Sequence, residues 1–191
     1  MVHQLLVPQQ EIRTGRLVLT PVTPADIDAV HELFSDARTW THLPAGRHTS
    51  RAATQDLVQR KIGGRVRHGL GSWAIRAADS GVFLGIGGVD LTAGGVWNLG
   101  YRLAPEHHGH GYATEVARAA VDAARELRPD VPVTARVLTN NSASARVLAR
   151  VGLTQVWQGP TRTAAPEGVE CQVWSDRTLT PAQLDWLVAN A

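Results

Sequence analysis

The sequence predicts a mixed α/β fold in which helices cover both faces of one mostly antiparallel sheet. Three strand-like runs, at residues 72–78, 82–91 and 97–103, are joined by short turns rich in small and polar residues, which favours an antiparallel meander. A helix-forming segment at 112–127 separates the third run from a fourth at 133–138. Because a helix connects them, these two strands should lie parallel and adjacent.

The first elements are marked by a strand pattern and a helix start. Residues 1–10 are expected to form a flexible tail ahead of a strand at 17–20. A helix at 23–35 has Thr23 as its N-cap, a proline at the first helical position and Asp26 three residues after the cap. This combination is typical of a helix amino terminus.

The remaining elements follow from similar signals. A second helix starts at Thr49 or Ser50 and ends near Gly69, and Gly63 and Gly64 lower its helix propensity. Later elements are expected to be a helix at 142–150, a strand pair at 153–157 and 169–174 with a flexible loop at 158–168 between them, and a short last helix that Pro181 opens.

Composition and charge indicate one cytoplasmic domain. The 191 residues suffice for one domain, 1–191, and no Pro/Ser-rich linker divides them. No apolar run approaches the roughly twenty residues of a membrane span. The net charge is only +2 and no basic run is interleaved with aromatics, so we expect neither a nucleic-acid nor a membrane partner. The one cysteine, Cys171, has an alternating context that favours a packed thiol over a nucleophile.

A glycine-containing loop between the strand at 97–103 and the helix at 112–127 has the features of an anion site. Pro105 ends the strand, and Gly109 and Gly111 have no Cβ that would keep a phosphate from the main chain. The first backbone N–H groups of the helix have no partner within it, and the helix dipole favours negative charge there. The loop is therefore a candidate phosphate site.

The spacing of this loop excludes two common classes of phosphate site. A P-loop ends in Lys followed by Ser or Thr, but Tyr112 and Ala113 stand there, so a nucleoside triphosphate is not expected. The dinucleotide fingerprint needs a third Gly or Ala, and Thr114 occupies that position. Another Gly-x-Gly, at 85–87, lies inside a strand with no helix after it.

Three blocks of the chain resemble the GNAT acetyltransferases. The run from His108 to Ala113, HGHGYA, resembles the R/Q-x-x-G-x-G/A motif that binds the pyrophosphate of acetyl-CoA in that family. Residues 140–153 are similar to the N-x-x-S helix and the following glycine of the branch that acetylates ribosomal-protein amino termini, and residues 14–34 also resemble that branch. The motif departs from the family at His108, where Arg or Gln is usual, which weakens the expected charge contact.

The resemblance implies a fold, a co-substrate and a reaction. In the GNAT fold two parallel strands splay apart and acetyl-CoA inserts its pantetheine between them; here these strands would be 97–103 and 133–138. The protein would transfer an acetyl group from acetyl-CoA to a primary amine, on a protein amino terminus or a small molecule, by direct attack in a ternary complex. Dimers are common in the family, so a homodimer is a further expectation.

The resemblance also implies which residues bind acetyl-CoA. The main chain of Leu103 would meet the pantetheine, and the loop after it the pyrophosphate. The implied cofactor-binding residues are Tyr101, Arg102, Leu103, His108, Gly109, His110, Gly111, Tyr112, Ala113, Thr114, Asn141 and Ser144.

Two polar residues at the start of the helix at 142–150 have alternative roles. Ser144, the serine of the N-x-x-S block, is the candidate catalytic residue that protonates the coenzyme A thiolate, since this helix lacks the tyrosine that other members use. Its hydroxyl could instead bond to the local main chain. Asn141 could meet the pantetheine or cap the helix.

The general base is not marked by a motif. Many relatives carry Glu where this chain has Asn98, and an amide does not accept a proton at neutral pH. Asp90, Glu170 and His42 are the alternatives, each also consistent with a solvated surface role, and a water chain is another route. Glu115 is expected to complement the dipole of the loop helix.

A metal site is not expected. His107, His108 and His110 are close together, but the chain has no second Cys/His group with ligand spacing. Trp40 and Trp157 lie beside loops and could line an acceptor pocket, although tryptophans are more often part of the core.

The sequence is consistent with two functions. The first is the N-acetyltransferase, with the loops at 40–50 and 157–168 holding only one carboxylate, Glu167, which disfavours a polycationic acceptor such as an aminoglycoside. The second is a non-catalytic acyl-CoA-binding regulator that kept the cofactor site and lost its base. Asn98, in place of the usual Glu, supports this second hypothesis.

Overall fold

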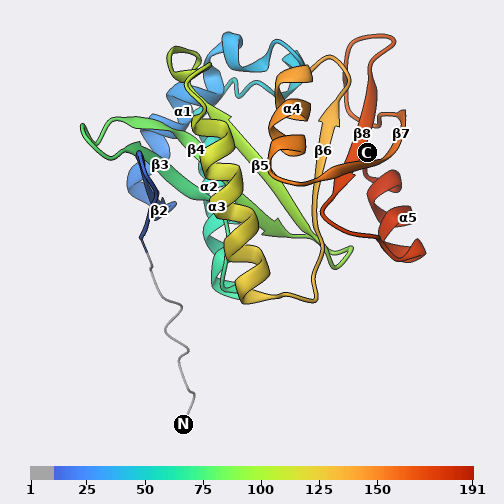
Figure 1. The fold of residues 1–191 in the computed structure, drawn as a ribbon. Coiled ribbons are helices and arrows are strands. Elements are labelled where there is room, and N and C mark those ends of the chain that lie inside the picture. Colours follow the sequence, from blue (N-terminus) through green and yellow to red (C-terminus); the bar gives the residue numbers. More distant parts are fainter. Residues whose placement is uncertain (1–10) are drawn as a thin grey trace.

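The computed structural model describes residues 11–191, and the tail expected at 1–10 lies outside them (Figure 1). Eight strands form one sheet. In sheet order they are β1 (Ile12–Arg13), β2 (Leu17–Pro21), β3 (Trp73–Ala77), β4 (Phe83–Leu91), β5 (Trp97–Leu103), β6 (Val133–Leu138), β8 (Glu170–Ser175) and β7 (Thr154–Pro160). Neighbouring strands are antiparallel except β5 and β6, which are parallel. The predicted mixed sheet is confirmed.

Helices cover both faces of the sheet, as predicted (Figure 1). They are α1 (Ile27–Ser35), α2 (Arg51–His68), α3 (Tyr112–Leu127), α4 (Ser142–Arg150) and α5 (Pro181–Ala189). Helices α1 and α2 bury Val30 and Val58 in one apolar cluster, and α3 and α4 bury Val116 and Leu148 in another on the opposite face. The apolar sides of α1 and α2 therefore share one core, and those of α3 and α4 share a second core on the other face of the sheet.

The alternation of side chains along β5 and β6 decides which groups face which helices. The residues packed in the core on the α3 side are Trp97, Leu99 and Leu103 on β5 and Val133, Ala135 and Val137 on β6. Successive side chains of a strand point to opposite faces. Arg102 and Arg136 therefore face the side of α1 and α2, and Arg102 packs over the ring of Trp40 there.

Helix boundaries agree with the sequence signals except at the first helix. There, residues Pro24–Asp26 form a 3-10 turn and α1 proper begins at Ile27. The reason is local, because the Asp26 carboxylate accepts the Thr23 backbone N–H at 2.8 Å and tightens the turn. Helix α2 ends as predicted at Gly69, whose φ of 80° is left-handed, and it continues unbroken through its two glycines.

The seventh strand was predicted too short. It continues past Trp157 to Pro160, and the loop expected at 158–168 is correspondingly shorter. Gly159 pairs with Cys171 and Pro160 with Glu170 on β8. Because β7 lies at the edge of the sheet, a proline without an N–H can end it at no loss to the ladder.

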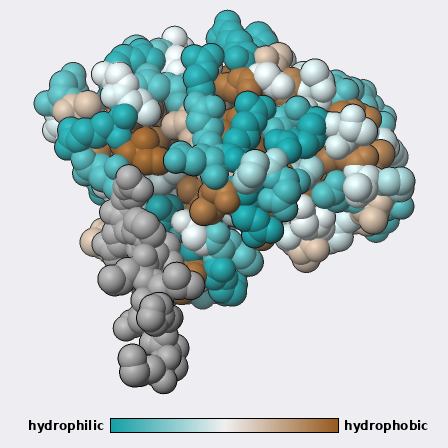
Figure 2. Space-filling view, turned by 60° about the horizontal axis from the view of Figure 1, so that its bottom comes forward, coloured by the Kyte–Doolittle hydropathy of each residue, from teal (hydrophilic) through white to brown (hydrophobic). Residues whose placement is uncertain are grey.

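The surface is mostly polar on the face that Figure 2 shows, where hydrophobic side chains occur in small separate groups. The large hydrophobic residues that are exposed within 11–191 are Val66, Val82, Leu127 and Val156. They lie on four different segments, which is normal for a protein surface. None of the helices in this part of the chain is both long and apolar enough to cross a membrane.

Candidate active site

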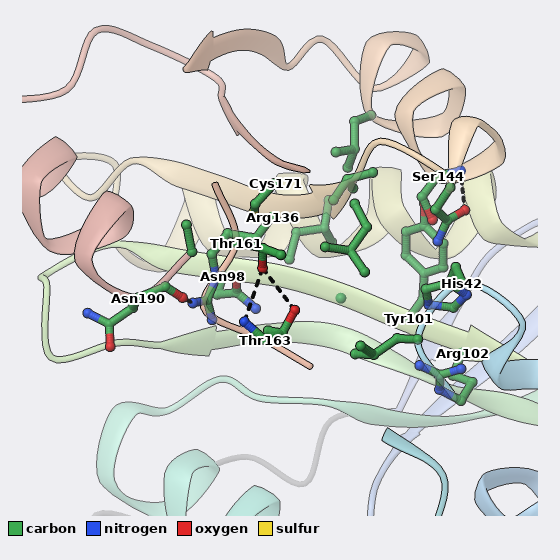
Figure 3. A pocket seen from close by; sticks show the side chains of 18 residues that line it. His42, Asn98, Tyr101, Arg102, Arg136, Ser144, Thr161, Thr163, Cys171 and Asn190 are labelled. Atoms are coloured by element: carbon green, nitrogen blue, oxygen red, sulfur yellow. Dashed lines mark hydrogen bonds between the residues drawn. The ribbon is translucent and has the colours of Figure 1, made fainter. Parts of the chain in front are cut away.

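The site begins where β5 and β6 separate. The two strands pair only at Trp97 with Val133 and Asn98 with Thr134, and no further ladder joins them. A cavity of about 290 Å³ opens beyond these pairs, lined by both strands, the start of α4 and the segment around His42 (Figure 3). The sequence-predicted site residues Tyr101, Arg102, Asn141 and Ser144 all line it. The splayed pair of strands thus provides a passage through the sheet.

On the α4 side of the passage lie two hydroxyl groups. The Tyr101 hydroxyl is buried and has no hydrogen-bond partner within residues 11–191. Burial raises the pKa of Tyr101 to about 12, and the neighbouring Ser144 hydroxyl opposes this shift without reaching hydrogen-bonding geometry. A phenol that stays protonated and faces a cavity can donate a hydrogen bond or a proton to a bound group.

Asn141 adopts the capping role that the sequence left open. Its Oδ1 accepts the backbone N–H of Ser144 at 3.2 Å, which satisfies one free donor of α4. The neighbouring Asn140 donates from Nδ2 to the backbone carbonyl of His42 at 3.0 Å. This bond joins the start of α4 to the loop that carries His42, so the two walls of the cavity are connected.

The loop before α3 has the geometry of an anion site. Gly109 and Gly111 have left-handed φ values of 80° and 81°, which residues with a Cβ rarely adopt. In the described part of the chain, the backbone N–H groups of Gly109, His110 and Gly111 donate to no other group. Those of Tyr112 and Ala113 belong to the first turn of α3, which has no internal acceptor for them. Five adjacent donors therefore surround the helix amino terminus.

His108, which stands where the family usually has Arg or Gln, forms a hydrogen bond with the protein's own main chain. Its Nε2–H donates to the backbone carbonyl of Leu103 at 3.0 Å, so the ring ties the loop to the end of β5. His110 similarly donates from Nδ1 to the carbonyl of His108 at 2.8 Å. The described residues hold no group of three or more metal-ligating side chains, and both rings already bond to the main chain.

The side chain of Arg16, which the sequence did not predict as part of the site, lies at the loop before α3. Arg16 donates from Nη1 to the His110 carbonyl at 2.8 Å, and its guanidinium lies 4.8 Å from the centroid of the Tyr112 ring. Its Nη2 also lies 2.7 Å from a Glu115 oxygen. A Cβ on Gly111 would be 3.4 Å from that guanidinium. Because Arg16 lies almost a hundred residues earlier in the chain, no local pattern pointed to it.

Glu115 has a wider role than the predicted complement to the helix dipole. Its Oε1 accepts from the Thr14 hydroxyl at 2.5 Å and from the Arg16 backbone N–H at 2.8 Å. Burial opposes ionisation, but these hydrogen bonds and the Arg16 charge hold the pKa of Glu115 below its usual value. The carboxylate therefore fixes the turn between β1 and β2 against the start of α3.

The opposite side of the passage carries two arginines. Arg102 lies 3.4 Å from the centroid of the Trp40 ring and donates to the Thr39 carbonyl. Burial lowers the pKa of Arg102 to about 10. Arg136, which is exposed and lines the cavity, donates to the Asn190 carbonyl, and desolvation by its neighbours lowers its pKa.

His42 is the one of the three proposed bases that lines this cavity. Asp90 instead forms an ion pair with Lys61, and Glu170 accepts a hydrogen bond from Gln158 at 2.7 Å. Burial, and then the charge of Arg102, lower the pKa of His42 below its usual value, so the imidazole is neutral at pH 7. A neutral imidazole can accept a proton.

The two tryptophans suggested for the acceptor pocket do not line it. Trp40 is buried and donates from Nε1 to the Phe34 carbonyl at 2.7 Å, and its ring stacks against the Arg102 guanidinium. Trp157 packs in the apolar cluster under α5. Cys171 is only 3% exposed and packs against Leu138, and burial raises the pKa of its thiol. The prediction of a packed thiol is confirmed.

Comparison with known proteins identifies the family. Residues 16–154 match the family model described as an acetyltransferase (GNAT) domain. The chain belongs to the GNAT acetyltransferases. YoaA of Bacillus subtilis, named an uncharacterized N-acetyltransferase, is 26% identical over 144 residues, which cover 74% of this chain and 81% of YoaA.

Solved structures agree with this assignment. An acetyltransferase from Agrobacterium tumefaciens superimposes with a TM-score of 0.73 at 26% identity, covering 88% of this chain and 95% of that one. The RimL ribosomal L7/L12 α-N-protein acetyltransferase in complex with coenzyme A superimposes with a TM-score of 0.69 at 19% identity, covering 86% and 97%. The predicted GNAT fold is confirmed, and RimL, at 19% identity, shares that fold. As in the family at large, acetyl-CoA is the expected acetyl donor.

Proposed function

We propose that this GNAT protein transfers the acetyl group of acetyl-CoA to a primary amine. One observation carries the proposal: the cavity between β5 and β6 has hydroxyl donors on one side of the sheet and a neutral histidine on the other. Two partners can therefore approach one point from opposite faces. Direct attack in a ternary complex requires that arrangement.

The α3 side of the passage suits coenzyme A. The five free N–H groups between Gly109 and Ala113 can bind a pyrophosphate, with the dipole of α3 favouring the anion and Arg16, paired with Glu115, at the edge of the loop. Beyond Asn98, β5 lacks a strand partner on its β6 side, so its main chain can pair with amide groups of the pantetheine as with an added strand. Bound acetyl-CoA would supply the activated acetyl group.

The remaining groups can handle the protons of the reaction. His42, neutral and on the acceptor side, accepts the proton of the attacking amine directly or through a water molecule. On the other side, Ser144 and Tyr101 can each protonate the departing thiolate, and Tyr101 is added here because its hydroxyl is buried, protonated and unpartnered. The side chain of Arg102 lies on the acceptor side of the sheet. Only its main chain is available to the cofactor.

A non-catalytic acyl-CoA-binding regulator is the second candidate. Asn98 lines the cavity at the position of the family's usual carboxylate. The described residues place no Asp or Glu in the cavity lining that could replace it. If His42 cannot act as the base, the site would bind the cofactor without turning it over.

One pair of measurements separates the two candidates. Calorimetry with acetyl-CoA measures binding, and a thiol-reactive dye measures coenzyme A release when a panel of amines is added. Because Cys171 is buried, the protein itself should contribute little background. Binding together with amine-dependent release supports the acetyltransferase; binding without release by any amine supports the regulator; and no binding contradicts both.

A further inference from the structure

The cavity has an unusual charge balance for a site that receives an amine. Its lining within residues 11–191 includes the side chains of Arg102 and Arg136 but no aspartate or glutamate side chain; Ala191, the last residue of the given sequence, also lines it, and its carbonyl end accepts the Arg162 backbone N–H at 2.6 Å. At neutral pH most amines are cations, and two nearby arginines repel them. An amine acceptor with no compensating negative charge would therefore enter this cavity poorly.

Neither arginine is neutralised by the protein that surrounds it. No carboxylate of the described chain lies within ion-pair distance of Arg102 or Arg136, whereas eight other arginines have such a partner. Each of the two donates to a single backbone carbonyl, Thr39 for Arg102 and Asn190 for Arg136. A guanidinium has five N–H donors, so most of this capacity remains available.

Both arginines lie on the side from which the acceptor would approach. Side-chain alternation places them on the face of the sheet opposite α3, with Asn98 and His42 (Figure 3). They are on opposite walls of the passage, Arg102 on β5 and Arg136 on β6. Trp40 holds Arg102 in place by stacking, while Arg136 is exposed and lines the cavity. Arg136 is thus the better placed for direct contact.

We propose that the acceptor is an amine that also carries an anionic group, a carboxylate or a phosphate, which binds Arg136 in the field of Arg102. This inference rests on the proposed function and names the substrate class of the same site. An arginine matches the planar or tetrahedral oxygens of either anion with two parallel hydrogen bonds. The same charges disfavour polyamines and aminoglycosides, so the site selects by attraction and by repulsion.

Pairs of acceptors that differ only in charge test this inference. Ethanolamine is compared with O-phosphoethanolamine, and alaninamide with alanine, with spermidine as the cationic acceptor; each rate is referred to the fraction of neutral amine present. The phosphate and the carboxylate pairs show which anion is preferred. The native protein should favour the anionic member of at least one pair by about 10-fold or more in kcat/KM.

Three variants of Arg136 sharpen the test. Arg136→Gln should lower the preference for the anionic acceptor over its neutral counterpart, measured as the ratio of their kcat/KM values, about 10- to 100-fold. Arg136→Lys should restore part of the loss, and Arg136→Glu should make spermidine the better acceptor. Arg67→Gln removes the same charge from an exposed position on α2 and should change neither value.

The outcomes distinguish the inference from the function on which it rests. If coenzyme A is released as fast with ethanolamine, alaninamide or spermidine as with O-phosphoethanolamine and alanine, the inference is wrong. The proposed acetyltransferase activity would still stand. An equal loss for both members of a pair in Arg136→Gln would lead to the same two conclusions. If no amine in the panel releases coenzyme A, the proposed function fails and the inference with it. Thermal melting of each variant checks that it is folded.

Discussion

The glycine loop before α3, residues 109–113, and the side of the cavity proposed to receive the acceptor are built in different ways. The loop presents backbone N–H groups, and it does so because Gly109 and Gly111 adopt left-handed conformations within one short segment. The acceptor side presents side chains from separate elements, with His42 from the α1–α2 connection, Arg102 from β5 and Arg136 from β6. Recognition of a constant cofactor can rely on main chain, while recognition of a particular acceptor requires side chains that can differ between relatives.

The largest effect is expected from covering the loop. Gly111→Trp should weaken acetyl-CoA binding by about 100-fold or more, because the indole would cover the N–H groups and a Cβ is strained at a φ of 81°. Gly81→Trp is the matched control: Gly81 has a φ of 71° and open space around it, but lies in the β3–β4 turn. Calorimetry measures both. Equal binding by the two variants would place the cofactor elsewhere.

On the acceptor side, His42→Gln should lower kcat by about 100-fold, because the amine would lose its proton acceptor. Binding of acetyl-CoA should not change, since His42 does not contact the loop. Steady-state kinetics with a saturating acceptor and calorimetry measure the two quantities. His68→Gln, at the end of α2, is the control. A kcat within a factor of two of the native value would remove His42 from the mechanism.

The two hydroxyl groups test whether the cofactor side also uses side chains. Tyr101→Phe should lower kcat about 10-fold, while stability stays within about 0.5 kcal/mol because the hydroxyl has no partner to lose. Ser144→Ala and the double variant complete a cycle. If the two groups share one proton transfer, the double variant should be no worse than the poorer single one. Full activity of the double variant would contradict both assignments.

A smaller effect is expected from the cap of α4. Asn141→Ala should lower the free energy of unfolding by about 1 kcal/mol, because the Ser144 N–H loses its acceptor. Asn141→Asp retains an acceptor and should keep most of that stability. Urea unfolding measures both variants. If Asn141→Ala weakens acetyl-CoA binding more than it weakens the fold, Asn141 also contacts the cofactor.

The smallest effect concerns pH. Because burial and the Arg102 charge lower the pKa of His42, kcat/KM referred to the neutral amine should hold as pH falls through 6.5 and decline only below it, as the imidazole becomes protonated. Arg102→Gln removes one cause, so the pKa of His42 should rise and the acid limb should move to higher pH by less than about one unit. The pH profiles of the two proteins measure this. A shift to lower pH would show that another group sets the limb.

The fold and the position of the glycine loop before α3 were predictable because their signals are local. The strand, the two glycines and the helix start follow one another between Trp97 and Glu115, and the sequence alone placed them. Strand β7 was less predictable, since Gly159 and Pro160 disfavour a strand and only pairing with β8 keeps them in it.

The acceptor side depends on packing between distant segments. His42 was one of three bases that the sequence could not separate, and its place follows from the Asn140 bond, ninety-eight residues away. Arg16 and Arg136 were missed for the same reason, since their sites depend on which elements pack together. The scarcity of carboxylates in the loops at 40–50 and 157–168, which hold only Glu167, was the one sequence signal that pointed toward an electropositive acceptor site.

The short ladder between β5 and β6 divides the sheet into two half-sheets, β1 to β5 and β6 with β8 and β7. Only two residue pairs connect them directly, so this seam is where amide protons should exchange with solvent most readily within the sheet. A pantetheine lying in the seam would supply the missing hydrogen bonds. Its binding should then slow deuterium uptake along residues 99–103 and 135–138, making the cofactor part of the sheet for as long as it stays.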